Sequence, residues 1–150
     1  MTMASTPRPA TPPDRLLLGP GPSPVPDRVL AAQARPVVGH LDPWFLQVMD
    51  EVAAMLRTAF RTDNRLTFPV SGTGSAGMET AIVNVVEPGD TVIVGVNGVF
   101  GTRLADTARR AGAEVVALEE PWGRVIDPDR VAAAVETHPD ARAVVLVQAE

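Results

Sequence analysis

The sequence predicts an α/β fold with a mainly parallel sheet, on two observations. Three short apolar runs, "TVIVGV", "AEVVAL" and "ARAVVLVQ", have the length and composition of strands buried on both faces. Segments with helical periodicity and helix-capping signals lie between these runs. Because helices that alternate with buried strands are typical of parallel sheets, we expect helices to cover both faces of the sheet.

The N-terminal part of the chain reads as a tail followed by an arm. Residues 1–14 are rich in Pro, Thr and Ser, show no apolar periodicity and lack the apolar region of a signal peptide, so we expect a flexible tail. Residues 15–40 include the run Gly19-Pro20-Gly21-Pro22, whose restricted backbone favours an extended, turning path. We expect an N-terminal arm over these residues, with a short helix near Pro26–Gln33.

A domain should occupy residues 41–150 and open with a long helix that ends at Arg61. Asp42 is placed to cap this helix and Pro43 to take its first position. Apolar side chains then recur at steps of three and four residues: Phe45, Val48, Met49, Val52, Met55, Leu56 and Phe60. This spacing puts them on one apolar face of the helix.

The rest of the domain alternates helices and strands. We expect, in chain order, a helix at 76–86, a strand at 91–96, a helix at about 102–111, a strand at 113–118, a helix at 128–137 and a buried strand at 141–148. On the first of these helices, Met78, Ile82, Val85 and Val86 should point inward. The printed chain stops directly after a core strand, where α/β proteins place their chemistry, so we interpret it as the N-terminal, incomplete part of a larger domain. Its last strand should then expose an edge and a face.

Composition narrows the classes of function. A net charge of −5, with 45% apolar and 21% charged residues, fits a globular domain and disfavours binding to nucleic acid, which needs clustered basic residues. There is no cysteine, and the two histidines, His40 and His138, are isolated, so no metal site is expected. No apolar run approaches the roughly 18 residues of a membrane span.

Lysine is absent from the chain. All 13 residues counted as Lys or Arg are arginine. Schiff-base chemistry needs a primary amine, which a guanidinium group cannot supply. Lysine-dependent covalent catalysis therefore cannot be completed by these residues alone.

The segment "PVSGTGSAGMET", Pro69–Thr80, carries three glycines at the spacing G-x-G-x-x-G. Glycines at the opening of a helix let backbone N–H groups approach an anion, and the helix start adds roughly half of an elementary positive charge. Thr73 and Ser75 add hydroxyl groups on the same turn. These features predict a phosphate site, and a tight strand-to-helix turn with incidental glycines is the alternative.

A dinucleotide is a poor match for this loop. NAD sites place an acidic residue at the end of the next strand, about 20 residues on. Here Asp90 lies at the beginning of the predicted strand, and Asn97 and Gly98 follow its end. The loop also comes late in the chain, behind an arm and a long helix. We therefore expect a single phosphate group.

Phe100, in "NGVFG", follows the strand at 91–96 and could reach the same end of the sheet as the glycine loop. An aromatic ring beside a phosphate site suits a flat heteroaromatic cofactor, which would stack on it. An ordinary core position is the alternative for Phe100. Arg103 is interpreted as a solvated side chain near a helix start, with a role as an anion ligand as the alternative.

Several motifs, in order, resemble one known family. The segments "LLLGPGPSPVP", "VVGHLDP", "FPVSGTGSAGMETAIVNVVEPGD" and "VGVNGVFG" resemble the N-terminal part of class V aminotransferases, in the branch of alanine–glyoxylate and serine–glyoxylate aminotransferases. The resemblance runs from about Arg15 to Glu150. It implies an N-terminal arm and the first part of the large domain of fold-type I pyridoxal-phosphate (PLP) enzymes. It also implies a homodimer, and we expect a cytoplasmic enzyme.

The resemblance assigns roles to residues of this chain. Thr73, Gly74 and Ser75 match positions that hold the phosphate of PLP, and many relatives have histidine where Ser75 stands. Phe100 matches an aromatic residue, often Trp, that stacks on the pyridine ring. Gly21 matches a backbone position that lines the substrate pocket.

The catalytic residues that the resemblance implies are not in this chain. Glu150 matches the start of a motif of the form E-[ST]-S-T-G, whose hydroxyl residues would follow it. The Schiff-base lysine, the aspartate under the pyridine nitrogen and the arginine that binds the substrate carboxylate all come later in the family. We therefore expect the 150-residue chain to be inactive by itself.

The implied reaction moves an amino group from alanine or serine to glyoxylate through PLP, so the partners are small amino acids and oxo acids. Two alternatives stay open. "VVGHLDPWF" and "EPWGRVIDP" also resemble the ureidoglycine–glyoxylate aminotransferases of purine catabolism, whose phosphate loop tends to be less glycine-rich. The second alternative is a non-catalytic module that binds phosphate or a partner protein, and the missing lysine favours this alternative.

Overall fold

The computed structural model describes residues 14–19 and 21–150. The chain falls into two compact units, with the boundary between Val37 and Val38. The predicted tail lies outside the described residues except for Asp14. The predicted division into an arm at 15–40 and a domain at 41–150 stays a prediction.

The first unit contains α1 (Asp27–Gln33), a helix of 7 residues. Pro26 precedes it, and Asp27 places an acidic side chain in its first turn, where the helix dipole favours negative charge. The helix lies within the range predicted for it. All described residues of this unit are exposed, so the described part has no buried core of its own.

The second unit begins with a long helix, α2 (Pro43–Phe60). Asp42 caps it, because its Oδ1 accepts a hydrogen bond from the backbone N–H of Trp44 at 2.9 Å. Arg61 follows it in the left-handed conformation, with φ 51° and ψ 51°. The bounds agree with the prediction to one residue. None of its 18 residues is buried, so the predicted apolar face is only partly covered.

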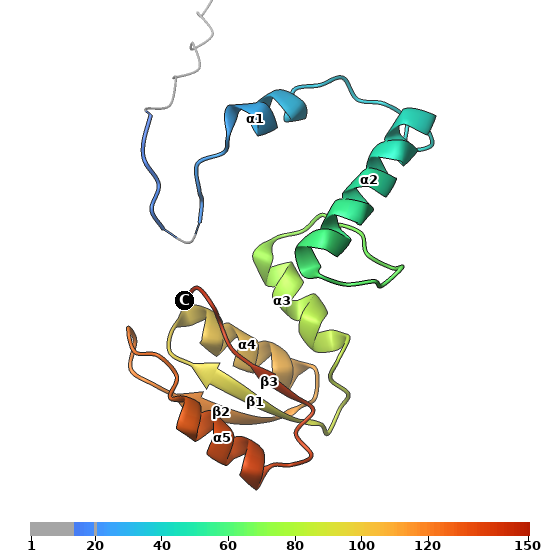
Figure 1. Ribbon diagram of the computed structural model, residues 1–150. Helices are drawn as coiled ribbons and strands as arrows, with labels where there is room; N and C mark the ends of the chain where they lie inside the picture. Colours follow the sequence, from blue (N-terminus) through green and yellow to red (C-terminus); the bar gives the residue numbers. More distant parts are fainter. Residues whose placement is uncertain (1–13, 20) are drawn as a thin grey trace, which may run out of the picture. The chain divides into compact units, whose positions relative to one another are not determined.

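A parallel sheet with the strand order β2-β1-β3 forms the centre of the second unit (Figure 1). The central strand β1 (Thr91–Val96) pairs along its whole length with β2 (Glu114–Glu119) and, on its other side, with β3 (Ala143–Val145). The helix α4 (Val99–Arg110) connects β1 to β2, and α5 (Pro128–Thr137) connects β2 to β3. Because the direction of the connection reverses, right-handed crossovers require the two helices to lie on opposite faces of the sheet.

The core consists of two apolar clusters, one on each face of β1. Val92 and Val94 point to one face, where they join a cluster with residues of α3 (Gly74–Val83) and α4: Ile82, Leu104, Ala105 and Ala108. Ile93 points to the other face and clusters with Leu118 of β2 and Ala134 of α5. This alternation follows from the two-residue period of a strand. The prediction of helices on both faces of a parallel sheet is confirmed.

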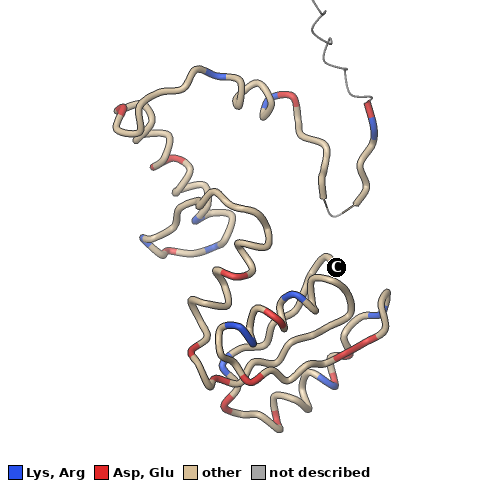
Figure 2. The backbone as a smooth tube through the Cα atoms, turned by 180° about the vertical axis from the view of Figure 1, so that it is seen from behind, with Lys and Arg blue, Asp and Glu red and all other residues tan. Residues whose placement is uncertain are grey.

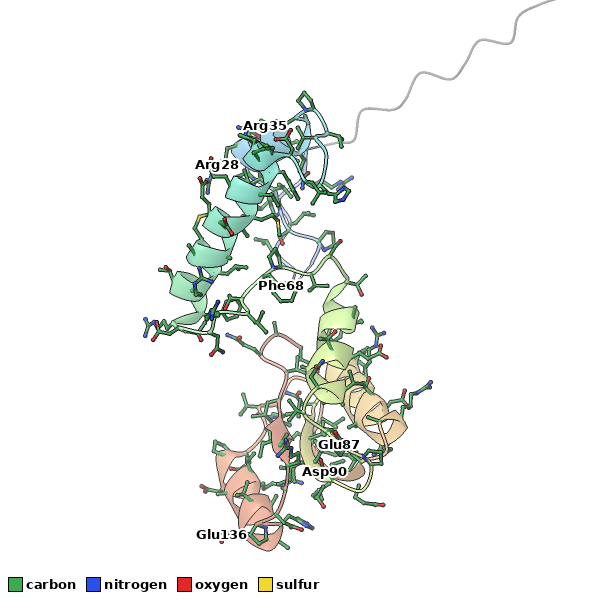
Figure 3. All side chains as sticks on the ribbon, turned by 90° about the vertical axis from the view of Figure 1, so that its right-hand side faces the viewer. Arg28, Arg35, Phe68, Glu87, Asp90 and Glu136 are labelled. Atoms are coloured by element: carbon green, nitrogen blue, oxygen red, sulfur yellow. The ribbon has the colours of Figure 1, made fainter. Side chains whose placement is uncertain are left out.

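A hydrogen-bonded turn joins the amino ends of β1 and β2. Oδ2 of Asp90 accepts a hydrogen bond from the backbone N–H of Glu87 at 2.8 Å; Figure 3 labels both residues. The N–H of Gly89 donates to the carbonyl of Gly112 at 2.8 Å, and both glycines have a φ of +93°, which other residues rarely adopt. Asp90 therefore stabilises the amino end of the sheet, opposite to the end where a ribose would bind.

Two predicted helices begin at different residues in the structure. α3 spans Gly74–Val83 rather than 76–86, because the Thr73 side chain caps it earlier and the helical pattern ends at Asn84. Val85 was predicted to point inward and is 43% exposed, whereas Val86, which also follows the helix, is 6% exposed as predicted. α4 begins at Val99 rather than near 102, directly after Gly98. The strand β2 is shifted by one residue, to Glu114–Glu119.

The last predicted strand differs most. β3 covers only Ala143–Val145, not 141–148, and it is not buried: Val144 is 42% exposed and Leu146 is 51% exposed. Among the described residues β3 pairs with β1 alone, which leaves one of its edges without a neighbour. The apolar run is typical of a strand with neighbours on both sides, so composition overestimated its burial. The predicted exposed edge is present.

Candidate functional site

Thr73, Gly74 and Ser75, which were predicted to bind a phosphate group, form the start of α3. Oγ1 of Thr73 accepts a hydrogen bond from the backbone N–H of Ala76 at 3.2 Å. Within the described residues, the backbone N–H groups of Gly74 and Ser75 meet no acceptor, as is usual in the first turn of a helix. No heavy atom lies within 4 Å of the point where a Cβ on Gly74 would stand. The Cβ position of Gly74 is therefore open, and two backbone donors at this helix start have no acceptor among the described residues.

The start of α4 is held by a carboxylate from the far end of the chain. Glu150 accepts hydrogen bonds from the backbone N–H of Phe100, at 2.6 Å from Oε1, and of Gly101, at 2.9 Å from Oε2. A carboxylate is favourable here because the first amides of a helix lack partners and carry partial positive charge. A Cβ on Gly101 would stand 2.7 Å from the carbonyl oxygen of Gly95, so glycine lets α4 approach β1 closely. Phe100 is thus fixed near the carboxyl end of β1.

Arg103 connects the two helix starts. Its Nη1 donates a hydrogen bond to Oγ of Ser75 at 2.6 Å. Its Cζ lies over the ring of Phe100, 5.7 Å from the ring centroid, which is within the range of a cation–π interaction. The predicted residues of α3 and the predicted aromatic residue of α4 therefore lie in one region, joined by this arginine.

A cavity of about 460 Å³ adjoins the start of α4. It is lined by residues 97–100 after β1, residues 122–125 after β2, and Glu150. Nδ2 of Asn97 donates a hydrogen bond to the carbonyl of Arg124 at 2.7 Å, which joins the two loops. In α/β proteins, ligands bind outside the carboxyl ends of the strands, where this cavity lies.

The arrangement is suited to binding and orienting a ligand. The free amides of α3, the hydroxyl groups of Thr73 and Ser75 and the guanidinium of Arg103 are donors for an anion. The ring of Phe100 is half-buried and suits a flat partner. Because the chain has no lysine, it supplies no side-chain amine for covalent chemistry.

Gly21, predicted to line a substrate pocket, lies in the first unit and is described separately from the other predicted residues. It is exposed, and apart from its chain neighbours no atom of the described residues lies within 4 Å of the point where its Cβ would stand. Its predicted role stays a prediction.

Sequence reasoning missed the contacts of two residues at the site, Arg103 and Glu150. Arg103 was interpreted as solvated; its three-residue spacing from Phe100 on a helix could have indicated the ring contact. Its hydrogen bond to Ser75 depends on how α3 packs on α4, which no local pattern reveals. Glu150 was noted only as the start of a motif, and its contact with α4 spans 49 residues or more of sequence.

Three further features of the described part of the chain bear on its function. There, no three His, Cys, Asp or Glu side chains come together in a group that could hold a metal ion. No helix in that part is both long enough and apolar enough to cross a membrane. Basic and acidic residues are interleaved along the described backbone (Figure 2).

Comparison with known proteins identifies the relatives of the chain. No family model matches the sequence. Over 131 residues the chain is 45% identical to the alanine–glyoxylate aminotransferase of Drosophila melanogaster. These residues make up 87% of this chain and 33% of that protein. The solved alanine–glyoxylate aminotransferase of Nostoc sp. matches with a TM-score of 0.83 and 51% identity, over 95% of this chain and 38% of that one. The homologues of this chain are class V aminotransferases.

A second branch of class V aminotransferases is also similar. The (S)-ureidoglycine–glyoxylate transaminase of Bacillus subtilis is 44% identical over 119 residues, which cover 79% of this chain and 29% of that protein. The chain thus spans about a third of the length of the curated relatives that it matches. The predicted resemblance and fold class are confirmed. Aminotransferase homologues imply PLP as the cofactor of the family.

Proposed function

We propose that the whole protein is a PLP-dependent aminotransferase that moves an amino group from alanine or serine to glyoxylate. The observation that carries the proposal is 45% to 51% identity with alanine–glyoxylate aminotransferases over a segment that contains the two helix starts. In this proposal the lysine that reacts with the cofactor comes from outside the 150 residues, because they contain none. The chain alone is then inactive.

The residues at the helix starts fit the phosphate and the ring of PLP. Gly74 leaves open the space that a Cβ would fill, and its N–H and that of Ser75 have no acceptor among the described residues. Thr73 and Ser75 add hydroxyl groups at the same helix start. Phe100, whose backbone is held by Glu150, offers a ring for stacking. These observations support Thr73, Gly74, Ser75 and Phe100 as cofactor-binding residues.

Each residue of this site would bind or orient, and none would form a bond to substrate. A bound PLP would supply the electron sink for amino-group transfer. The amides and hydroxyl groups at the start of α3 would hold the phosphate, and Phe100 would restrict the tilt of the ring. Holding both ends orients the substrate bond that breaks, which lowers the entropic part of the barrier. We propose that Gly21 lines the substrate pocket.

A second amino donor is supported by one observation. Identity of 44% to a ureidoglycine–glyoxylate transaminase is close to the identity with the alanine–glyoxylate enzymes, so this segment supports both donors. The names of both groups of relatives give glyoxylate as the acceptor. The donor is therefore decided by direct assay.

The proposal includes a homodimer in the cytoplasm. Large apolar side chains stay exposed on α2 and on the segment after it: Trp44 52%, Met55 62%, Phe60 75%, Leu66 87% and Phe68 59%. Figure 3 labels Phe68, which projects from the segment before α3. Many exposed apolar side chains in one part of a protein mark an interaction surface. A second copy of the chain is the partner that we propose for them.

The test uses the full-length protein with added PLP. We expect a visible absorbance band from bound cofactor, reduction by borohydride that fixes the cofactor to one lysine outside residues 1–150, and transfer from alanine or serine to glyoxylate. Activity with ureidoglycine alone would favour the second donor. Binding of inorganic phosphate without any binding of PLP would overturn the proposal in favour of a non-catalytic module.

A further inference from the structure

Arg103 is the charged side chain that links the two helix starts. It leaves α4 one turn after Phe100 and reaches Ser75, on the first turn of α3. Among the described residues, no carboxylate lies within 4.0 Å of its guanidinium, whereas Arg110 on the same helix pairs with Asp106 at 2.8 Å. The charge of Arg103 is thus not neutralised by an ion pair.

We propose that Arg103 is a positioning residue for the phosphate of the cofactor, acting through the hydroxyl group of Ser75. This inference rests on the proposed function. The guanidinium donates to one lone pair of Oγ at 2.6 Å. Arginine has no acceptor atom, so the hydroxyl hydrogen of Ser75 cannot bond back to it and is left for an anion at the start of α3.

The hydrogen bond also raises the donor strength of that hydroxyl. A donor that is itself accepting a charge-assisted hydrogen bond is polarised and binds an anion more strongly. A phosphate monoester carries about −1.5 to −2 charges near pH 7, so an unneutralised positive charge one side chain away adds to the attraction. The helix start and Arg103 would thus act on the same phosphate.

A second contact of Arg103 is with Phe100. The guanidinium lies over the ring, 5.7 Å from its centroid, at an exposed position where such a contact is weak. We therefore expect the loss of this contact to change binding of the cofactor ring little.

The experiment compares PLP with pyridoxal, which lacks the phosphate, in the full-length apo-protein. We expect Arg103→Met to raise the Kd for PLP by about tenfold to a hundredfold, the effect of losing a charge-assisted hydrogen bond. The Kd for pyridoxal should change by less than about threefold. Arg103→Lys should restore part of the affinity, because it keeps the charge but loses the planar geometry.

Arg109→Met is the matched control. Arg109 is exposed on the same helix, and its loss changes the net charge by the same amount. We expect it to leave the Kd values for PLP and pyridoxal within twofold of the wild type. A loss equal to that of Arg103→Met would mean that net charge, not position, matters, and would overturn the inference.

A double-mutant cycle with Ser75→Ala tests the route through the hydroxyl group. If Arg103 acts through Ser75, the double variant should bind PLP about as weakly as the weaker single variant. Fully additive losses, equal losses for PLP and pyridoxal, or no loss at all would overturn the inference. If Arg103→Met does not fold, Arg103→Lys and Ser75→Ala supply the same comparison. Wild-type protein that does not bind PLP would instead overturn the proposed function.

Discussion

At the scale of single residues, Gly74 and Gly77 differ only in their distance from the helix start. Both lie on α3, and a Cβ on either one would meet no heavy atom within 4 Å. Neither position therefore requires glycine for packing. If Gly74 borders a phosphate, a side chain there interferes with the ligand alone, and this separates binding from folding.

We therefore predict that Gly74→Leu weakens PLP binding by about tenfold or more while the melting temperature of the apo-protein does not fall. The magnitude follows from the cost of forcing extra methylene groups into filled space. Titration of the full-length apo-protein with PLP measures the change. Gly77→Leu is the control and should bind PLP as the wild type does. Unchanged PLP affinity in Gly74→Leu would count against the assignment of the loop.

At the scale of elements, the start of α4 depends on a residue that is distant in sequence. Gly98, at the cap position, has no side chain to accept from the first amides of the helix. Glu150 takes this role for the amides of Phe100 and Gly101. α4 thus has a cap that is tertiary rather than local.

Removal of this cap should loosen the first turn of α4. For Glu150→Ala we expect a loss of about 0.5 to 2 kcal/mol of local stability, the usual cost of losing a helix cap. Hydrogen exchange at the amides of Phe100 and Gly101 reports it, as an increase of roughly twofold to thirtyfold. Glu136→Ala, with the same change in charge on the exposed C-terminal part of α5, is the control (Figure 3). Equal exchange in both variants would show that the carboxylate does not hold the helix.

The sequence predicts individual elements better than the contacts between them. The Asp42-Pro43 and Asp127-Pro128 pairs located two helix starts because capping is a local interaction, and both carboxylates do accept the expected backbone hydrogen bonds. The bounds of α3 and α4 were wrong by two or three residues, since Thr73 and Gly98 start these helices without such a pair. β3 was predicted too long and too buried because the burial of a strand depends on its neighbours.

In the candidate site, too, local patterns could be predicted from the sequence and contacts between distant segments could not. Thr73, Gly74 and Ser75 were proposed from the sequence, because a helix start rich in glycine and hydroxyl groups is a local pattern. Phe100 was proposed because strand ends in a parallel sheet lie together, and it does lie near Ser75 through Arg103. The contacts of Arg103 with Ser75 and of Glu150 with α4 join segments 28 and about 50 residues apart, so they depend on the completed fold.

At the scale of the whole molecule, exposed apolar side chains on α2 lead to a prediction about assembly. Met55 is 62% exposed and Phe60 is 75% exposed, and none of the residues of α2 is buried. If a second copy covers this helix, the double variant Met55→Asp, Phe60→Asp should raise the dimer Kd at least tenfold, as loss of central interface residues usually does. Analytical ultracentrifugation of the full-length protein measures it. Val135→Asp, at a 41% exposed position on α5, is the control. A wild-type monomer would contradict the prediction.

The strand order β2-β1-β3 has a consequence for synthesis on the ribosome. β1 leaves the exit tunnel first, and its partner on one side, β2, follows after a single helix, while β3 arrives only after a second crossover. The unit β1–α4–β2 can close around Val92 and Val94 before β3 has been translated, because most of the cluster on that face comes from earlier residues. The nascent chain therefore acquires the start of α3 and two of the three strands of its described sheet before Glu150, which caps α4, has been added.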